Sequence, residues 1–168
     1  MQPSLPLGSI GETPTMAVRM ELARILIREL TDYQIIELRE AREGGEAVGE
    51  DPFQGPLTDD ARSFPIVIGL PEAQAIERRL KGVQISRPQT HDLLASVIRE
   101  LGGTLHSIRI HDLADATFFA ELVVMLQDGS ETRIDARPSD AIALGVAGDV
   151  PIFVEEHVLD AATSDPGA

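Results

Sequence analysis

The N-terminal third of the chain has the residue pattern of β-strands. Residues 17–30 (AVRMELARILIREL) are rich in β-branched side chains, and a second run of this kind, YQIIEL, begins at Tyr33. The spacing of three apolar residues in the first run would also suit a helix. The β-branched content and the second run nevertheless favour two antiparallel strands that turn at Thr31 and Asp32.

Two helices are predicted in the middle of the chain. A short strand over 62–69, whose proline indicates a sheet edge or a strand start, comes before them. Apolar residues then recur at helical spacing between Pro71 and Gly82. A second apolar stripe follows Thr90, which we expect to be the N-cap, and it stops at a Gly-Gly pair.

The C-terminal half returns to strands before a third helix, for which Ser139 is the expected cap. An Asp128-Gly129 turn is predicted to join two of the strands into a hairpin. Strand pairs precede and follow the helices without a βαβα rhythm, which indicates an α+β fold with a mostly antiparallel sheet and about three helices. The predicted strands are 104–110, 117–126, 131–136 and 151–154, and the predicted helical segments are 140–146 and 155–162.

Three segments carry no hydrophobic period and set the expected domain boundaries. Residues 1–17 are rich in Pro, Gly and Ser and are predicted to be a disordered leader. Residues 40–61 are an acidic, Gly- and Pro-rich loop, and 163–168 are a tail. The sequence thus predicts a single compact domain over 18–162, a size that forms a core without disulfides or metals.

The amino-acid composition limits the kinds of functional site that the protein can have. The 168 residues include 14 basic and 28 acidic side chains, for a formal charge of −14, and no cysteine. Disulfides, thiolate zinc sites and cysteine nucleophiles are therefore excluded, and the charge argues against tight, non-specific DNA binding. No signal peptide or membrane span is recognised, so we expect a cytoplasmic protein without membrane contact.

Two motifs share an arrangement that can hold an anion. In each, an Arg-Pro pair precedes a hydroxyl residue and an aspartate at a predicted helix start. An arginine fork, a hydroxyl and free helix N–H groups together suit a phosphate. The same residue types begin helices in any protein, so the two motifs leave a structural and a functional interpretation evenly balanced. The motifs are Arg87-Pro88-Gln89-Thr90-His91-Asp92 and Arg137-Pro138-Ser139-Asp140.

Carboxylates that surround the predicted hairpin and third helix could hold a divalent cation. Asp112, Asp135 and Asp140 are the candidate ligands, with Asp92 as a further possibility. Mg²⁺ and Mn²⁺ take oxygen ligands and activate water for phosphodiester hydrolysis. Solvated acids in an acidic protein have the same pattern, so this alternative stays open.

With these motifs in view, the chain resembles the bifunctional nuclease family. The resemblance implies a compact α+β domain, a homo-oligomer, and an enzyme that cleaves both DNA and RNA. It extends over about 18–160. The matching stretches are Phe64-Pro65-Ile66-Val67-Ile68-Gly69, Glu72-Ala73, Ala75-Ile76, Arg87-Pro88-Gln89-Thr90-His91-Asp92-Leu93-Leu94, Ile110-His111-Asp112-Leu113, Thr117-Phe118-Phe119-Ala120, Ile134-Asp135-Ala136-Arg137-Pro138-Ser139-Asp140-Ala141-Ile142-Ala143-Leu144 and Pro151-Ile152-Phe153-Val154.

The first hypothesis is a divalent-metal-dependent nuclease that acts on DNA and RNA, with Mg²⁺ or Mn²⁺ as cofactor. Its proposed roles are His91, Asp92, Asp135 and Asp140 for catalysis, Arg87, Thr90, Arg137 and Ser139 for phosphate, and Asp135, Asp140 and Asp112 for metal. The alternative is a non-catalytic oligomeric module that binds a small anion, a nucleotide or a protein partner at the same helix starts.

Overall fold

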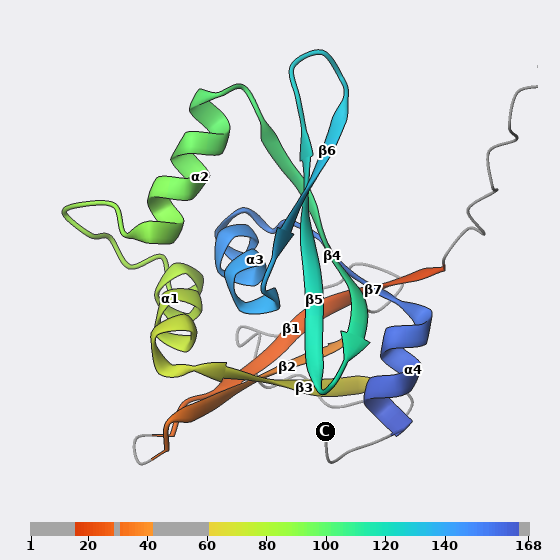
Figure 1. The fold of residues 1–168 in the computed structure, drawn as a ribbon. Coiled ribbons are helices and arrows are strands. Elements are labelled where there is room, and N and C mark those ends of the chain that lie inside the picture. The colour runs from red at the N-terminus through yellow and green to blue at the C-terminus, as the bar shows by residue number, and fades with distance from the viewer. Residues whose placement is uncertain (1–15, 29–30, 42–60, 165–168) are drawn as a thin grey trace, which may run out of the picture.

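A seven-stranded, mostly antiparallel sheet is the scaffold of the protein, and helices pack against it (Figure 1). The computed structural model describes residues 16–28, 31–41 and 61–164. The strand order is β3-β2-β1-β7-β4-β5-β6, and β4 with β7 is the one parallel pair among the described strands. This confirms the predicted α+β class with a mostly antiparallel sheet.

The described residues contain four α-helices, one more than the sequence pattern indicated, because the short segment near the end is a full helix. The strands are β1 (Ala17–Leu26), β2 (Tyr33–Glu40), β3 (Ser63–Gly69), β4 (Thr104–Ala114), β5 (Thr117–Met125), β6 (Glu131–Ala136) and β7 (Ile152–Glu155). The helices are α1 (Leu70–Leu80), α2 (Thr90–Glu100), α3 (Pro138–Gly145) and α4 (Glu156–Ser164), with a 3₁₀ turn, η1 (Val146–Gly148), after α3.

The predicted hairpins form, and β4, which was not assigned to either of them, is longer than expected. β1 pairs antiparallel with β2, and β5 pairs antiparallel with β6. β4 was expected to end at Ile110, but a register shift between Ile110 and Asp112 lets its ladder with β5 continue to Ala114. The turn that follows has Asp115 and Ala116 at positive φ (49° and 55°), as a tight two-residue hairpin requires. Asp112 therefore lies inside a strand.

The boundaries of the domain also differ slightly from the predicted ones. β1 begins at Ala17 and α4 continues to Ser164, so secondary structure reaches beyond both ends of the predicted domain. The rest of the predicted leader (1–15), most of the predicted acidic loop (42–60) and the end of the tail (165–168) lie outside the described residues. In the part of the chain that the structure describes, no helix is long and apolar enough to cross a membrane.

The hydrophobic core lies between one face of the sheet and helices α1, α3 and α4. The sheet curls around this core. Phe64 on edge strand β3 stacks on Phe118 of β5, with ring centroids 5.3 Å apart, although four strands separate them in the sheet order. The curl brings α1, α2 and α3 to one side of the sheet (Figure 1).

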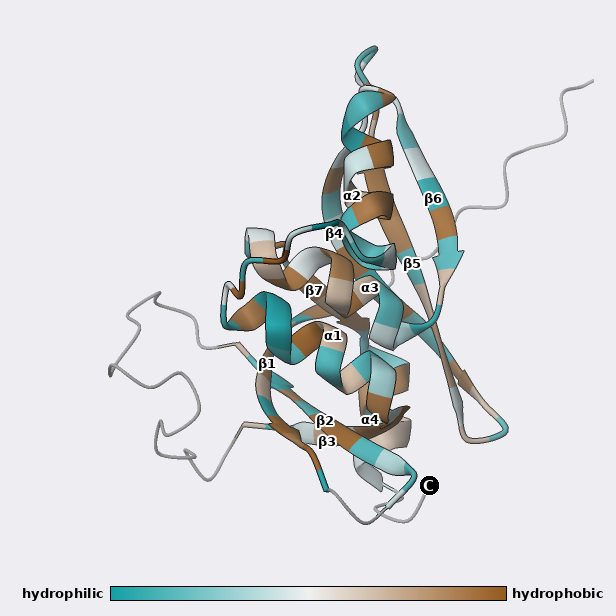
Figure 2. Ribbon diagram, turned by 90° about the vertical axis from the view of Figure 1, so that its left-hand side faces the viewer, coloured by the Kyte–Doolittle hydropathy of each residue, from teal (hydrophilic) through white to brown (hydrophobic). Residues whose placement is uncertain are grey.

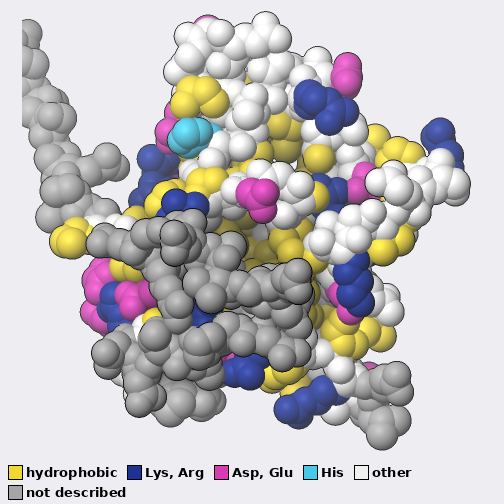
Figure 3. Space-filling model, turned by 180° about the vertical axis from the view of Figure 1, so that it is seen from behind, with side chains coloured by type: hydrophobic (Ala, Val, Ile, Leu, Met, Phe, Trp, Pro, Cys, Tyr) yellow, Lys and Arg dark blue, Asp and Glu magenta, His cyan; other side chains and the backbone are white. Residues whose placement is uncertain are grey.

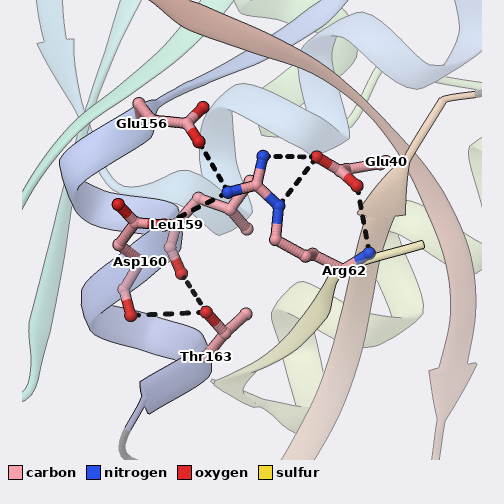
Figure 4. A network of polar contacts seen from close by, with 6 residues as sticks. All are labelled: Glu40, Arg62, Glu156, Leu159, Asp160 and Thr163. Carbon is pink, nitrogen blue, oxygen red and sulfur yellow. Dashed lines mark hydrogen bonds and ion pairs between the residues drawn. The ribbon is translucent and has the colours of Figure 1, made fainter. Parts of the chain in front are cut away.

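An arginine fastens α4 to the strands near β3. Arg62 donates to Glu40 from Nε and Nη2 at 2.9 and 2.6 Å, and its Nη1 reaches Glu156 at 2.6 Å and Asp160 at 3.2 Å (Figure 4). Hydrogen bonding from Arg62 lowers the pKa of the Glu40 carboxyl. This network joins β2, β3 and α4 at the side of the sheet away from α2.

The side of the molecule opposite to the view of Figure 1 carries mixed charge. Where described residues are visible on that face, basic side chains lie scattered among acidic and apolar ones (Figure 3). Among the described strands, several charged side chains are paired with a neighbouring strand: Arg39 with Glu21, Arg24 with Glu37, and Arg109 with Glu121 and Glu155.

The three helices on the site side are buried to very different extents. α3 has seven buried residues, whereas α2 has none and packs beside α3 and β4 (Figure 2). The starts of both helices were predicted, but their caps were wrong. Gln89 rather than Thr90 is the N-cap of α2, and Arg137 rather than Ser139 is the N-cap of α3. Because Pro138 takes the first helical position of α3, the residue before it becomes the cap.

Candidate active site

The two Arg-Pro helix starts come together in space. His91, the second residue of α2, places Nε2 3.0 Å from Oδ1 of Asp140, the third residue of α3. The two residues are 49 positions apart in sequence. The structure thus joins one residue from each predicted anion motif into a single contact.

The contact extends to a third helix start. Arg137 donates to Asp140 from Nε at 2.8 Å and from Nη2 at 3.2 Å, and its Nη1 lies 3.1 Å from Oε1 of Glu72 in the first turn of α1. The result is a chain of contacts His91–Asp140–Arg137–Glu72, which we call the helix-start cluster. It gathers two carboxylates, a guanidinium and an imidazole where α1, α2 and α3 begin.

The cluster keeps Asp140 ionised. Burial opposes the charge, but hydrogen bonds from Arg137 and His91 outweigh it, and the net effect lowers the pKa of the Asp140 carboxyl. The hydrogen bond and charge of Asp140 in turn raise the pKa of the Arg137 guanidinium. An ionised carboxylate only accepts hydrogen bonds, so His91 donates from Nε2. In a neutral imidazole of this tautomer, Nδ1 carries the lone pair and can accept a proton.

A second ionic contact lies beside the cluster and holds α2 in place. Asp92 accepts from Arg78 Nη2 at 2.8 Å, from Arg79 Nη1, and from the backbone N–H of Gln89 at 3.1 Å. Burial opposes ionisation of Asp92, and the Gln89 hydrogen bond with the two arginines outweighs it, which lowers the pKa of the carboxyl. Asp92 was predicted to be catalytic, but both of its oxygens are occupied by these donors. Its place in the structure is that of a helix cap and an ion-pair partner.

Arg79 extends this contact to α3. Its Nη2 donates to the backbone carbonyl of Leu144 at 3.1 Å, so the guanidinium bridges α2 and the end of α3 from its place on α1. The sequence interpretation missed Arg78, Arg79 and Glu72. Glu72 lies in one of the stretches that carry the family resemblance, but two arginines in the last turn of a helix and an acid in its first turn equally serve the helix dipole.

The three carboxylates proposed to bind metal do not form one group. Asp135 is exposed and lies opposite Glu121 in the β5–β6 ladder, while its neighbour Ile134 lies opposite the core residue Leu122. Because successive side chains of a strand point to opposite faces, Asp135 lies on the sheet face away from the core. Asp112 is exposed on β4, where its Oδ1 accepts from the backbone N–H of Leu113.

The described side chains also lack the grouping that a metal site needs. Within the residues that the structure describes, no group of three or more His, Asp or Glu side chains could hold a metal ion. Asp140 is the predicted metal ligand that lies in the helix-start cluster, and its oxygens already contact Arg137 and His91. The residues present therefore do not fit the predicted three-carboxylate metal site.

The predicted phosphate ligands differ in exposure. Arg87, ahead of α2, and Thr90, its first residue, are exposed, and the Arg87 side chain makes no hydrogen bond or ion pair with another described residue. Arg137 is exposed as well, with 65 % of its side chain accessible. Ser139 is only 5 % exposed within α3, so its hydroxyl does not reach the surface where a phosphate would bind. Of the four predicted phosphate ligands, Arg87, Thr90 and Arg137 are thus exposed and Ser139 is buried.

Comparison with known proteins gives one family. The family model described as the bifunctional nuclease domain matches residues 57–166, which include α1 to α4 and the whole helix-start cluster. An uncharacterized protein of Mycobacterium tuberculosis, found in two strains, is 44 % identical over 98 residues. That alignment covers 58 % of this chain and 57 % of the mycobacterial protein, so the chain spans little more than half the length of this relative.

Two plant proteins are more distant relatives. Bifunctional nuclease 2 and bifunctional nuclease 1 of Arabidopsis thaliana are 28 % and 26 % identical to this chain over 97 residues. Those residues are 56 % of this chain and 30 % of each plant protein.

Proposed function

The chain belongs to the bifunctional nuclease domain family, and from this premise we propose that it hydrolyses phosphodiester bonds in DNA and RNA. The names of the two Arabidopsis relatives support a nuclease-type activity. The structural observation that carries the proposal is the His91–Asp140 contact, which joins the two motifs at 3.0 Å.

The helix-start cluster has the parts of an acid–base catalyst. We assign His91 as the general base or acid and Asp140 as the group that orients its imidazole and stabilises the charged form. A base held by a third group is the usual arrangement for activating a nucleophile, and positioned proton transfer contributes about 10²- to 10⁴-fold in rate. The His91 side chain is only 16 % exposed, so contacts with its neighbours also restrict the orientation of the ring.

In this proposal, the exposed residues Arg87, Arg137 and Thr90 bind the phosphate. Arg87 is available for an anion, and Arg137 is exposed enough to contact a phosphate while it remains near Asp140. Guanidinium groups bind phosphate oxygens through two parallel hydrogen bonds. Thr90, the first residue of α2, adds a hydroxyl one position before His91.

We also propose that hydrolysis depends on a divalent ion. Mg²⁺ commonly binds through one or two carboxylates, several waters and substrate phosphate oxygens, and it does not require a cage of three protein ligands. With a chain charge of −14, cations also reduce repulsion between the protein and a polyanion. We assign no step of the reaction to the ion.

The direct test is hydrolysis of single-stranded DNA, double-stranded DNA and RNA in Mg²⁺ or Mn²⁺. Wild type, Asp140→Ala and the matched control Asp160→Ala, purified identically, should be compared. Asp160 is 64 % exposed on α4 and lies in the Arg62 network, outside the helix-start cluster. We expect Asp140→Ala to lose about 100-fold or more in rate and the control to keep its rate. Equal residual activity in wild type and Asp140→Ala would show that a contaminant is responsible.

One observation favours the alternative of a non-catalytic anion-binding module. Both oxygens of Asp140 already have partners, and Arg137 joins two carboxylates, so the cluster is satisfied without a substrate. This alternative is favoured if nucleotides or phosphate raise the melting temperature of the protein while no substrate is hydrolysed.

A further inference from the structure

The helix-start cluster contains one carboxylate to which the proposed mechanism gives no role. Glu72, in the first turn of α1, is only 19 % exposed, and its Oε1 lies 3.1 Å from Nη1 of Arg137. Its other oxygen lies against the N-cap residue of the helix, because a Cβ atom added to Gly69 would overlap Glu72 Oε2. The missing side chain of Gly69 thus gives the carboxylate its place beside Arg137, an arginine to which we assign phosphate binding.

Arg137 can bind a phosphate without leaving either of its carboxylate partners. A guanidinium has five N–H donors. Asp140 accepts from Nε and Nη2, and Glu72 contacts Nη1, so among the described residues each terminal nitrogen keeps one N–H group without a carboxylate. The Arg137 side chain is 65 % exposed, so these two groups can reach a ligand. A phosphate bound there also lies close to two fixed negative charges.

The fixed charges around the three helix starts leave a surplus of one positive charge. In the helix-start cluster, with a neutral imidazole, one guanidinium faces two carboxylates, for a net charge of −1. The neighbouring contact of Asp92 with Arg78 and Arg79 has a net charge of +1. Arg87, which makes no ion pair with another described residue, adds one more positive charge four positions before His91. These charges sum to +1, although the whole chain carries −14.

This balance suits the charge of a phosphodiester better than that of a terminal phosphate. An internal phosphodiester carries one negative charge. A phosphate monoester has a second pKa of about 6, so it carries nearly two negative charges above neutral pH. Hydrogen bonding and charge from Asp140, with the charge of Glu72, raise the pKa of the Arg137 guanidinium. Both carboxylates therefore act on the group that would meet the phosphate, and both repel a second negative charge on the ligand.

We propose that Glu72 is a specificity-determining residue, whose charge makes the site accept a singly charged phosphodiester and reject a doubly charged phosphate monoester. Because it assumes that phosphate binds at the helix-start cluster, this role rests on the proposed function. Specificity is a difference of two affinities, and a repulsive charge lowers the affinity for the monoester more than that for the diester. The site then acts on bonds inside a strand and leaves terminal phosphates in place.

Two p-nitrophenyl esters test the selectivity during hydrolysis. At pH 8, bis(p-nitrophenyl) phosphate carries one negative charge and p-nitrophenyl phosphate carries two. The measurement is kcat/KM for each ester in Mn²⁺, for wild type, Glu72→Gln and the matched control Glu77→Gln. Glu77 is 40 % exposed on the same helix and pairs with Lys81, outside the helix-start cluster.

We expect wild type and Glu77→Gln to prefer the diester by the same factor. Glu72→Gln should lose at least tenfold of that preference, mainly through a lower KM for the monoester. An unchanged preference in Glu72→Gln would overturn the proposed role of Glu72.

Ligand binding without divalent ions separates this selectivity from nuclease activity. Melting temperatures are measured in EDTA with thymidine 5′-phosphate and with its methyl ester, which carries one negative charge fewer. We expect the methyl ester to stabilise wild type more, Glu72→Gln to lose the difference, and Glu72→Asp, which keeps the charge, to retain it. This selectivity without any hydrolysis would refute nuclease activity and retain the role of Glu72. If neither ligand stabilises wild type, or if Glu72→Gln and Glu72→Asp behave alike, that role is wrong.

Discussion

At the scale of single residues, the site depends on which aspartate has which partners. Asp140 and Asp92 occupy similar positions in two similar motifs, but Asp140 contacts an imidazole and Asp92 contacts two arginines. The sequence identified both aspartates and His91 as candidates. It could not assign their roles, because Arg78 and Arg79 come from a different helix and their approach to Asp92 is set by tertiary packing.

Asp92→Asn is expected to lower the free energy of unfolding by about 1–3 kcal/mol, the cost of leaving partly buried hydrogen-bonding groups without a charged partner. The Nε atoms of Arg78 and Arg79 already have no partner among the described residues, so loss of the carboxylate charge leaves these guanidiniums still less satisfied. Urea unfolding followed by circular dichroism measures the change. Asp112→Asn is the control, since Asp112 is exposed and bonds only the next backbone N–H.

The dependence of stability on pH follows from the same two aspartates. Folding lowers the pKa values of Asp92 and Asp140, so their contribution is fully present above the unfolded-state value of about 3.9. It is lost as the pH falls through the lower folded-state values. Urea midpoints measured from pH 7 to pH 2 should therefore fall in acid, and by a smaller amount in Asp92→Asn. An equal fall in both proteins would contradict these assignments.

At the scale of elements, α2 is the helix that depends most on polar contacts at its start. The apolar period and the Gly-Gly stop predicted its position well, because local signals determine where a helix begins and ends. How the helix docks could not be predicted from that period. The apolar arc of α2 is wide, and only the structure shows that the part with Ala95 and Ile98 packs inward.

Hydrogen exchange should separate α2 from α3. Amides of α2 are expected to exchange faster than those of α3, since α3 has seven buried residues and α2 has none. Arg79→Met should accelerate exchange in α2 by removing the bridge from Asp92 to Leu144.

Arg99→Met serves as the matched control for this experiment, because Arg99 is 70 % exposed at the other end of α2. Mass spectrometry of peptides over 90–100 and 138–145 gives the readout. Uniform acceleration of both helices by Arg79→Met would indicate global destabilisation and would contradict a local tether.

At the scale of the whole molecule, the curl of the sheet brings distant segments together. Local signals such as β-branched content and turn residues predicted most of the strands, but they do not encode which strands meet after the sheet twists. The stacking of Phe64 on Phe118 is such a contact. The same limit applies to the helix-start cluster, whose three helix starts were visible in the sequence as separate features.

Phe64→Ala is expected to cost about 3–5 kcal/mol of unfolding free energy, because Phe64 is 1 % exposed and its removal leaves a cavity where β3 meets β5. Phe119→Ala, at a site that is 40 % exposed on the same strand as Phe118, should cost much less. Urea unfolding distinguishes the two variants. Similar losses would contradict the closure of the curled sheet through Phe64.

In the proposed mechanism, two helix starts form one acid–base unit through His91 and Asp140. A double-mutant cycle in kcat/KM for RNA and single-stranded DNA, with His91→Ala, Asp140→Asn and the double variant, measures this coupling. Residues that act as a unit give strongly non-additive losses. We predict that each single variant loses about 10²-fold or more and that the double variant is little worse. Additive losses, or wild-type rates in either single variant, would contradict the claim.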